Sequence, residues 1–371
     1  MRRITLAATA LCLLLTAAAA AAGCGVPATP GNGGGRPPGA GTPSAEPTAA
    51  GSVNVYNWGE YIDRSVLEIF RAETGITVNY FEYQSNEEMY SLLSLGGTNV
   101  DVIIPSDYMV SRLIEEDRLE ELDFSNIPNF SLIDPRYKSL EYDPGNRYSV
   151  AYMTGTVGLI YNSAMISDEV TGWGSLFDSR YSGQILMFDN SRDAFGIALK
   201  YLGYSQNTVS EKEIREAYDL LERQKPFLQA YVMDQIFDKL EAGEAWIGPY
   251  YAGDFLIMRE NNPDLAFVRP HEGSNQFVDA MCIPKGASNK TNAEIFIDFM
   301  CRSDIALMNM EVVYYTSANF EATEVFAEEL DAEDYEIMFA NDDVLAGCDV
   351  FTNLPREILE LYNDLWVELK R

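Results

Sequence analysis

The stretch that decides the fold runs from residue 53 to residue 106 and reads VNVYNWGEYIDRSVLEIFRAETGITVNYFEYQSNEEMYSLLSLGGTNVDVIIPS. Short runs rich in Val, Ile and aromatic residues alternate in it with longer segments whose apolar residues recur at helical spacing. Gly75 supplies a stop for the first helix, and Asn86 can cap the second. Strand, helix, strand, helix, strand predicts a parallel α/β sheet with crossover helices. The predicted strands are 53–56, 76–81 and 101–104, and the predicted helices are 63–73 and 86–95.

Further elements are predicted beyond this stretch. Apolar side chains recur at helical spacing in 211–224, 291–302 and 356–370, and 184–188 is strand-like. In an open parallel sheet, ligands bind beyond the carboxyl ends of the strands. A binding site is therefore expected near 57–61 and near 106–108.

The chain begins with a segment typical of a bacterial signal peptide. Arg2 and Arg3 precede an apolar run from 4 to 22 that closes on Ala21-Ala22-Gly23-Cys24. Small residues directly before a cysteine resemble a lipobox, which predicts a signal peptide over 1–24 with lipidation of Cys24. Plain secretory cleavage and a retained membrane helix are the alternatives. Residues 25–52, almost all Gly, Pro, Ala, Thr and Ser, predict a flexible tether, which places the folded part outside the cytoplasmic membrane.

The composition excludes several classes of protein. The formal net charge of −31 repels nucleic acid and anionic lipid and concentrates cations, although solubility alone would also explain it. Because His271 is the only histidine, zinc sites and histidine-based catalytic triads are not expected, and no cofactor or metal is predicted. The cysteines beyond Cys12 and Cys24 allow at most one disulfide. They are Cys282, Cys301 and Cys348.

Aromatic residues and acids occur together at several predicted loops. These combinations are Trp58 with Glu60, Tyr250 with Tyr251, Phe277 with Asp279, and the polar group Asp189, Asn190 and Asp193 after a strand. Each has a simpler explanation as a packed ring beside a solvated acid. For the group after the strand, the simpler explanation is a helix N-terminus, where acids interact favourably with the helix dipole.

Taken together, these groups suit one class of ligand. An aromatic face attracts an ammonium group by roughly 0.5 to 2 kcal/mol. A buried cation also needs carboxylates, because desolvating an unpaired charge costs several kcal/mol. Several acids interleaved with aromatic rings therefore predict a slender organic cation with more than one charge, rather than a sugar or an anion.

The motifs between residues 53 and 162 resemble those of the spermidine/putrescine-binding proteins of polyamine ABC importers. The resemblance continues to the C-terminus, more loosely after Gly243. It implies a two-lobed α/β periplasmic-binding-protein fold of type II that closes over one polyamine in the inter-lobe cleft. The implied lobes are 53–154 with 279–322 and 155–278 with 323–371, and the implied hinges lie near 153–155 and 277–279. The motifs are NWGEY at 57–61, ETGI at 73–76, EYQSNEEMY at 82–90 and DVIIPS at 101–106.

The resemblance also implies ligand-binding positions, carried over residue by residue. The positions that match the family are Trp58, Glu60, Tyr61, Ser106, Tyr108, Asp279 and Tyr315. The departures are Gly59 for a hydroxyl residue, Tyr251 and Phe277 for two wall tryptophans, and Asn190 with Asp193 for a pair of acids. The last change leaves one carboxylate fewer, which bears on the choice between spermidine and putrescine. A C-terminal glutamine of the family is placed on Thr352.

The sequence therefore predicts an extracytoplasmic, lipid-anchored and monomeric binding protein, not an enzyme. It would capture spermidine or putrescine and deliver it to the membrane permease of an ABC transporter. One alternative is the same fold with another organic cation, such as thiamine, a quaternary amine or an amino sugar. A secreted glycoside hydrolase would use paired carboxylates, Asp189 with Asp193 or Glu60 with Asp279. A structural surface lipoprotein would bind no ligand.

Overall fold

The computed structural model of the protein describes residues 51–96 and 99–371, and its first strands form the parallel sheet that the sequence predicts. β1 (Gly51–Trp58) pairs in parallel with β2 (Ile76–Tyr83) on one side and with β3 (Val102–Ile103) on the other. The crossover helices are α1 (Ser65–Thr74) and α2 (Asn86–Ser94). The predicted signal peptide, Cys24 and residues 25–50 of the predicted tether lie outside the described residues.

Local chemistry accounts for the ends of these helices. Gly75 ends α1 in the left-handed conformation, with φ of 75°, as the sequence predicts. The predicted cap of α2 is wrong by one residue: the hydroxyl of Ser85 accepts the N–H of Glu88 and caps the helix. Asn86 is instead the first helical residue, and its buried side chain is free for the cleft described below.

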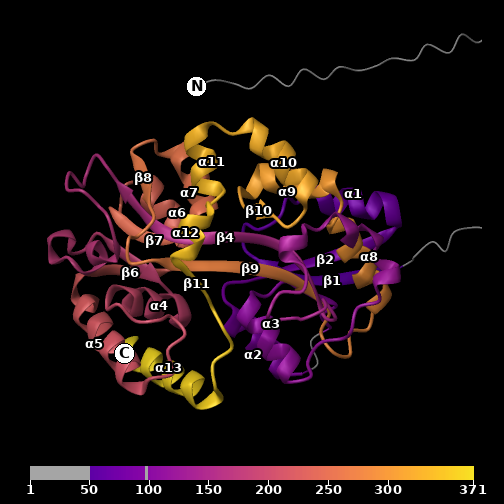
Figure 1. Cartoon of the computed structure of the whole chain (residues 1–371), viewed down its shortest axis with the longest axis horizontal. Coiled ribbons are helices and arrows are strands. Elements are labelled where there is room, and N and C mark those ends of the chain that lie inside the picture. Colours follow the sequence, from indigo (N-terminus) through magenta and orange to yellow (C-terminus); the bar gives the residue numbers. More distant parts are fainter. Residues whose placement is uncertain (1–50, 97–98) are drawn as a thin grey trace, which may run out of the picture. The chain divides into compact units, whose positions relative to one another are not determined.

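Two long antiparallel strands cross the middle of the molecule (Figure 1). They are β4 (Ser149–Asn162) and β9 (Ser274–Cys282), and β9 also pairs antiparallel with β3. Met153 lies opposite Asp279 and Gly155 lies opposite Phe277, with a bulge in β4 between Ala151 and Met153. The strand order is β2-β1-β3-β9-β4-β7-β5-β6. The predicted hinge residues therefore face one another on neighbouring strands.

The remaining strands continue this sheet beyond β4. They are β5 (Ile185–Phe188), β6 (Leu228–Val232), β7 (Ile247–Tyr251) and β8 (Leu265–Val268), with the short β10 (Thr316–Ser317) and β11 (Cys348–Val350) at its sides. Strand β5 confirms the predicted strand at 184–188.

The remaining helices pack on these strands. They are α3 (Asp107–Glu115), α4 (Ser191–Tyr201), α5 (Glu211–Gln224), α6 (Gln235–Glu241), α7 (Ala252–Asn261), α8 (Lys290–Met300), α9 (Ser303–Val313), α10 (Phe320–Glu329), α11 (Ala332–Met338), α12 (Asp342–Ala346) and α13 (Arg356–Leu369). Short 3₁₀ turns occupy Phe124–Asn126, Pro128–Leu132, Pro135–Tyr137, Trp173–Phe177, Ser179–Tyr181 and Lys225–Phe227. The predicted helices at 211–224, 291–302 and 356–370 are confirmed as α5, α8 and α13, to within two residues at each end.

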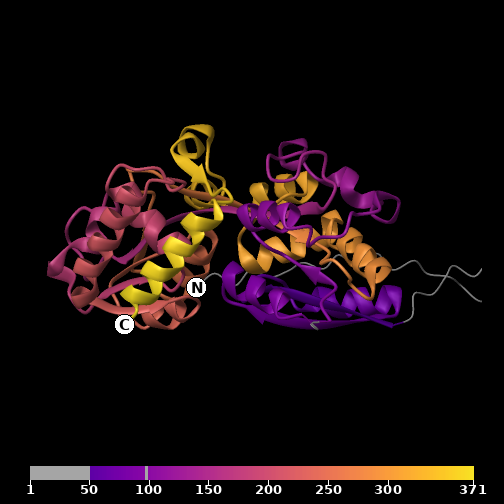
Figure 2. The ribbon, with the colours of Figure 1, turned by 90° about the horizontal axis from the view of Figure 1, so that it is seen from below.

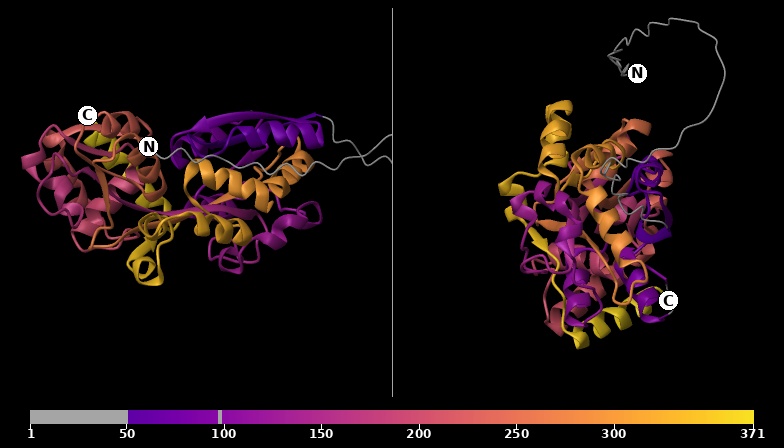
Figure 3. Two further views of the ribbon diagram at one scale, coloured as in Figure 1. Left: turned by 90° about the horizontal axis from the view of Figure 1, so that it is seen from above. Right: turned by 90° about the vertical axis from the view of Figure 1, so that its right-hand side faces the viewer.

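Figure 2 shows two halves of the molecule, one on each side of the crossing strands. Most buried apolar residues belong to two large clusters, and a smaller cluster contains Tyr83, Met109 and Phe351. One core contains Val53, Phe70 and Phe296, where α1 and α8 cover β1 and β2 (Figure 3). The other contains Phe195 and Tyr362, from α4 and α13. We call the part around β1, β2 and β3 the N-terminal lobe and the part around β5, β6 and β7 the second lobe. The two-lobed α/β architecture is confirmed, and the lobe limits given above remain a prediction.

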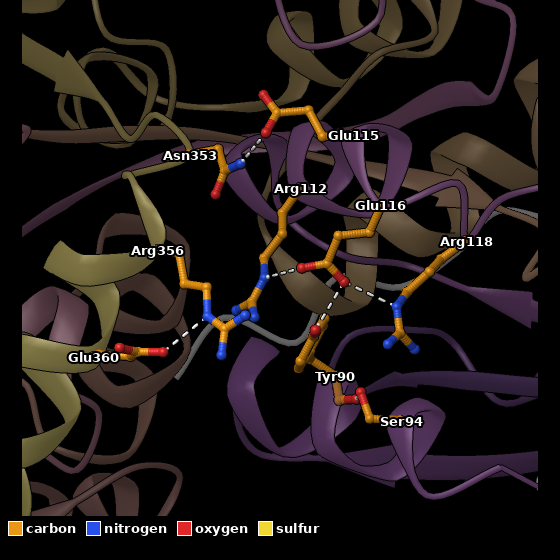
Figure 4. Close-up of polar contacts among 9 residues, drawn as sticks. All are labelled: Tyr90, Ser94, Arg112, Glu115, Glu116, Arg118, Asn353, Arg356 and Glu360. Carbon is orange, nitrogen blue, oxygen red and sulfur yellow. Dashed lines mark hydrogen bonds and ion pairs between the residues drawn. The ribbon is translucent and has the colours of Figure 1, made fainter.

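Outside the cleft, the lobes also touch through the segment that precedes α13. The amide of Asn353 donates a hydrogen bond of 2.7 Å to Glu115 at the end of α3 (Figure 4). Next to it, Arg112 and Arg118 both bond to Glu116. These contacts fix α3, whose first residues face the cleft.

Two chemical properties of the described residues bear on function. Cys282 and Cys301 are buried free thiols and Cys348 is a half-buried one, so these cysteines form no disulfide within residues 51–96 and 99–371. Within the same ranges, no helix combines the length and apolar character that crossing a membrane requires.

In the N-terminal lobe, the buried carboxylate of Asp101 connects segments that are far apart in the sequence. The Asp101 side chain is fully buried, and it accepts hydrogen bonds of 2.9–3.1 Å from the backbone and side-chain amides of both Asn54 and Asn289. Asn54 belongs to β1, and Asn289 directly precedes α8. The carboxylate therefore links the sheet to the helix that covers it.

We predict that Asp101→Ala lowers the free energy of unfolding by about 3 kcal/mol, because it leaves several buried donors without an acceptor. Denaturant unfolding followed by circular dichroism measures this difference. The matched control is Glu360→Ala, which removes an exposed carboxylate bonded to Arg356 and should leave the unfolding midpoint unchanged. Equal effects of the two substitutions would contradict the linking role of Asp101.

Candidate ligand-binding site

A cavity lies where the two lobes face one another. Side chains from β1, α2, α3, α4, α7 and β9 reach it. The structure brings together eleven of the twelve residues predicted to bind ligand. They are Trp58, Glu60, Tyr61, Ser106, Tyr108, Asn190, Asp193, Tyr251, Phe277, Asp279 and Tyr315.

The twelfth residue, Thr352, does not line the cavity. Its backbone N–H donates to Asn207 and its side chain is exposed, whereas the neighbouring Phe351 is buried and lines the cavity. The Phe351 ring meets the edge of Tyr108 at 5.9 Å. The structure therefore does not place Thr352 with the other eleven residues, and the segment between β11 and α13 has no periodicity that predicts which side chain turns inward.

Asp279 has the most distinctive environment in the cavity. Its side chain is 4% exposed, and the Tyr61 hydroxyl donates a hydrogen bond of 2.8 Å to Oδ2. Oδ1 is also buried but accepts no hydrogen bond from any residue that the structure describes. Burial raises the pKa of Asp279 to about 7, although the hydroxyls of Ser106 and Tyr61 oppose the shift and the nearby charge of Asp193 adds to it. One carboxylate oxygen is thus left as an acceptor without a donor.

Aromatic rings surround this carboxylate. Tyr61 meets Tyr315 edge-on at 5.1 Å, and Tyr251 meets Phe277 edge-on at 5.4 Å. A Cβ at Gly155 would lie 2.8 Å from the Phe277 ring, so a glycine is needed opposite this ring. The rings present apolar faces toward a narrow space, which suits a methylene chain carrying positive charges.

Trp58 is held in place by the end of β3. Its indole N–H donates to the carbonyl of Ile104 at 2.8 Å, and the Tyr83 hydroxyl donates to the same carbonyl at 2.7 Å. The two rings lie 4.8 Å apart. Glu60 follows in a left-handed backbone conformation, with φ of 47°, which is rare for a residue with a side chain. The turn that carries the predicted tryptophan and acid is therefore rigid and strained.

The polar group after β5 has both of the roles considered for it. The Asn190 side-chain oxygen accepts the N–H of Asp193 and caps α4, which confirms the simpler explanation for that residue. Asp193 nevertheless faces the cavity, where desolvation raises its pKa to about 6 and the negative charge of Glu87 adds to the shift. Asp189 points elsewhere and bonds to Lys370.

The sequence interpretation missed several polar residues of the cavity. Asp254, in α7, accepts the Tyr315 hydroxyl at 2.6 Å, and burial raises its pKa to about 8. Burial also raises the pKa of Asp107 to about 8, although it accepts the N–H groups of Val278 and Tyr108. The other missed polar residues are Gln84, Ser85, Asn86, Glu87, Asp234 and Asn275.

Most of these missed residues come from the first turns of helices. Asn86 and Glu87 begin α2, where the Asn86 amide donates to Ser106 and Tyr108, and the Tyr108 hydroxyl donates to Glu87. Asp107 lies between Ser106 and Tyr108, which were both predicted to bind ligand. This position in the sequence could have identified it as a cavity residue. Asp254 lies one helical turn after Tyr251, which is a weaker signal.

All charged side chains that line the cavity are acidic. No Lys, Arg or His lines it, and no carboxylate among its lining residues forms an ion pair within the part of the chain that the structure describes. The described ranges also contain no cluster of three His, Cys, Asp or Glu side chains able to hold a metal ion. The arrangement can therefore bind an organic cation that supplies N–H donors and an apolar stem. The acids lining it are Glu60, Glu87, Asp107, Asp193, Asp234, Asp254 and Asp279.

Comparison with known proteins identifies the family. The family model of bacterial extracellular solute-binding proteins matches residues 65–340. The spermidine/putrescine-binding periplasmic protein of Escherichia coli K12 is 34% identical over 277 residues, covering 74% of this chain and 80% of that protein. Spermidine/putrescine-binding periplasmic protein 1 of Haemophilus influenzae is 30% identical, with coverages of 89% and 91%.

Solved structures agree with these sequence matches. A candidate spermidine/putrescine ABC transporter protein from Listeria monocytogenes superposes with a TM-score of 0.81 at 39% identity, covering 86% of this chain and 98% of that one. PotD, the spermidine/putrescine ABC transporter substrate-binding protein of Streptococcus pneumoniae, gives a TM-score of 0.71 at 34% identity, covering 86% and 99%. The predicted two-lobed periplasmic-binding-protein fold of type II is confirmed. The chain belongs to the family of bacterial extracellular solute-binding proteins that includes the spermidine/putrescine-binding periplasmic proteins.

Proposed function

We propose that this protein is the extracytoplasmic substrate-binding lipoprotein of an ABC importer, which captures spermidine or putrescine and delivers it to the membrane permease. The observation that carries the proposal is the Asp279 oxygen without a donor, buried among aromatic rings in a cavity with no cationic side chain. The names of the relatives support the same class of ligand. Those relatives are binding proteins, which also supports a role other than catalysis.

The chemistry of a polyamine matches this cavity. An ammonium group donates hydrogen bonds to carboxylates, and a charged hydrogen bond stabilises a complex by about 1.5 to 3 kcal/mol. Asp279 would accept from an amine at the centre, while Asp193 and Glu60 would bind amines farther along. The methylene stem would pack against Trp58 and Phe277. Thiamine or a quaternary amine offers no N–H at its cationic nitrogen and would leave Oδ1 of Asp279 without a donor.

Closure of the lobes would follow from contacts made on both sides at once. The pairing of β4 with β9 supports hinges near 153–155 and 277–279, because both strands cross between the lobes there. The bulge beside Met153 supports bending at the same place. We include in the proposal the lobe limits 53–154 with 279–322 and 155–278 with 323–371.

Calorimetric titration tests the ligand class. Spermidine and putrescine should each bind with one-to-one stoichiometry and micromolar or tighter affinity. Asp279→Asn keeps the shape of the side chain but removes its charge, so it should weaken binding about 10- to 100-fold.

The matched control is Asp168→Asn, because that exposed carboxylate bonds to Arg180 and Tyr181 away from the cavity. Its affinity should equal that of the wild type. A folded wild-type protein that bound neither amine would overturn the proposal. Binding by Asp279→Asn within threefold of wild type would show that the ligand lies elsewhere.

We predict that polyamine affinity rises between about pH 6 and pH 8. Burial raises the pKa of Asp279 to about 7, that of Asp193 to about 6 and that of Asp254 to about 8, so these groups hold protons at low pH. A cation binds their ionised forms and releases those protons, whereas most of the ligand's amines stay charged over this pH range. Affinity should therefore fall by up to about tenfold per pH unit for each group protonated.

Titrations at pH 6, 7 and 8 in two buffers of different ionisation enthalpy measure both the affinity and the number of protons released. Asp279→Asn should flatten the profile around pH 7. Tighter binding at pH 6, or proton uptake on binding, would contradict the prediction that these acids lose protons when the ligand binds.

The proposed lipid anchor depends on Cys24. We predict that the wild-type protein incorporates labelled palmitate in cells and stays with the membrane fraction, and that Cys24→Ala loses the label because no acceptor thiol remains. Cys12→Ala, which changes the other cysteine of the predicted signal peptide, should keep the label. Labelling of Cys24→Ala equal to that of wild type would contradict lipidation at this position.

A further inference from the structure

One carboxylate of the cavity, Asp234, is positioned by both lobes. It follows β6 and precedes α6 in the second lobe, and its Oδ1 accepts the Tyr250 hydroxyl at 2.9 Å. Its Oδ2 accepts the side-chain amide of Gln84 at 3.1 Å, and Gln84 lies just after β2 in the N-terminal lobe. The carboxylate of Asp234 therefore accepts one hydrogen bond from each lobe.

Gly59 makes this approach possible. A Cβ added there would lie 2.4 Å from Oδ2 of Asp234, closer than two non-bonded atoms can come, and 3.4 Å from the Gln84 amide nitrogen. The backbone of Gly59 has an ordinary negative φ, so the requirement for glycine at this position is one of space and not of backbone conformation. The resemblance to the polyamine-binding family had marked position 59 as a departure, where a hydroxyl residue is expected. The lost hydroxyl is thus replaced in space by a carboxylate from the opposite lobe.

Asp234 also shares its end of the cavity with two other acids. The charges of Asp234 and Glu60 both act on Asp254, where they add to the effect of burial in raising the pKa of that carboxyl. None of the three forms an ion pair with a Lys or Arg among the described residues. Each oxygen of Asp234 accepts one hydrogen bond, which leaves a lone pair on each for a further donor.

We propose that Asp234 binds a terminal ammonium group of the ligand at the Gly59 end of the cavity, and that Gly59 is required to admit it. The inference rests on the proposed polyamine function and assigns a specificity-determining residue to it. Asp193, Asp279, and Asp234 together with Glu60 would then form three acidic positions in the cavity. Three acidic positions match the three amines of spermidine and favour it over putrescine, despite the carboxylate lost at Asn190.

Spermidine titration of Asp234→Asn tests this assignment directly. The variant should bind spermidine at least about tenfold more weakly than wild type, because an amide cannot form the charged hydrogen bond. Its matched control is Asp238→Asn, which neutralises an exposed carboxylate of the same helix outside the cavity and should bind within twofold. Binding by Asp234→Asn within threefold of wild type would overturn the inference.

The two mono-acetylated spermidines separate direct contact from an effect on closure. Each acetylated spermidine lacks one terminal charge. For at least one of them, Asp234→Asn should therefore weaken binding less than threefold. If Asp234→Asn weakened the binding of spermidine and of both acetylated forms equally, Asp234 would have a structural role and the inference would be overturned.

A double-mutant comparison tests the role of Gly59. Gly59→Ala alone should weaken spermidine binding about tenfold, but in an Asp234→Gly background it should change binding less than threefold, because the clash is gone. Equal penalties in both backgrounds would overturn the steric part of the inference. A wild-type protein that bound no polyamine would overturn the proposed function itself, an outcome seen before any variant is compared.

Discussion

The burial of negative charge without a positive partner is the constraint on which the rest of this structure depends. A carboxylate moved into a cleft loses hydration worth several kcal/mol, and the protein can recover this only through hydrogen bonds, a cation or protonation. Asp279 has one hydrogen bond from Tyr61 and no cation, so its pKa rises to about 7. The carboxyl therefore holds a proton at low pH, which the proposed ligand cation would displace.

The antiparallel strands β4 and β9 link the charge of Asp279 to the proposed movement of the lobes. Asp279 lies on β9 directly opposite Met153 of β4, at the crossing between the lobes. Tyr61 reaches it from the N-terminal lobe, whereas Tyr251, from the second lobe, packs on Phe277 two residues away. Under the proposed closure, a ligand held at Asp279 would lie beside the hinge.

The sequence predicted the parts of the fold and site that depend on local pattern. The helical spacing in α5 and α13 and the strand, helix, strand order of β1 to β3 are local, and they place Trp58 and Ser106 at neighbouring strand ends. Asp234 could not be found this way, because it meets Gln84 only when two lobes far apart in sequence face one another. Thr352 lies outside the cavity because the spacing of residues in a loop does not predict which side chain turns inward. The predicted cap of α2 was wrong by one residue because Ser85 and Asn86 are both good caps.

The large negative charge of the chain and the selectivity of the cavity have different causes. Many surface acids pair with Arg or Lys, as Glu116 does with Arg112 and Arg118, or remain hydrated, and such charges attract any cation weakly. Carboxylates on both lobes of the cleft, such as Glu60 and Asp234, instead repel one another across it when ionised. Under the proposed function, closure needs a counter-ion that reaches carboxylates on both lobes, which an extended polyamine does and a small inorganic cation does not. Selectivity would then follow from the placement of the acids along the cleft and not from the net charge of the chain.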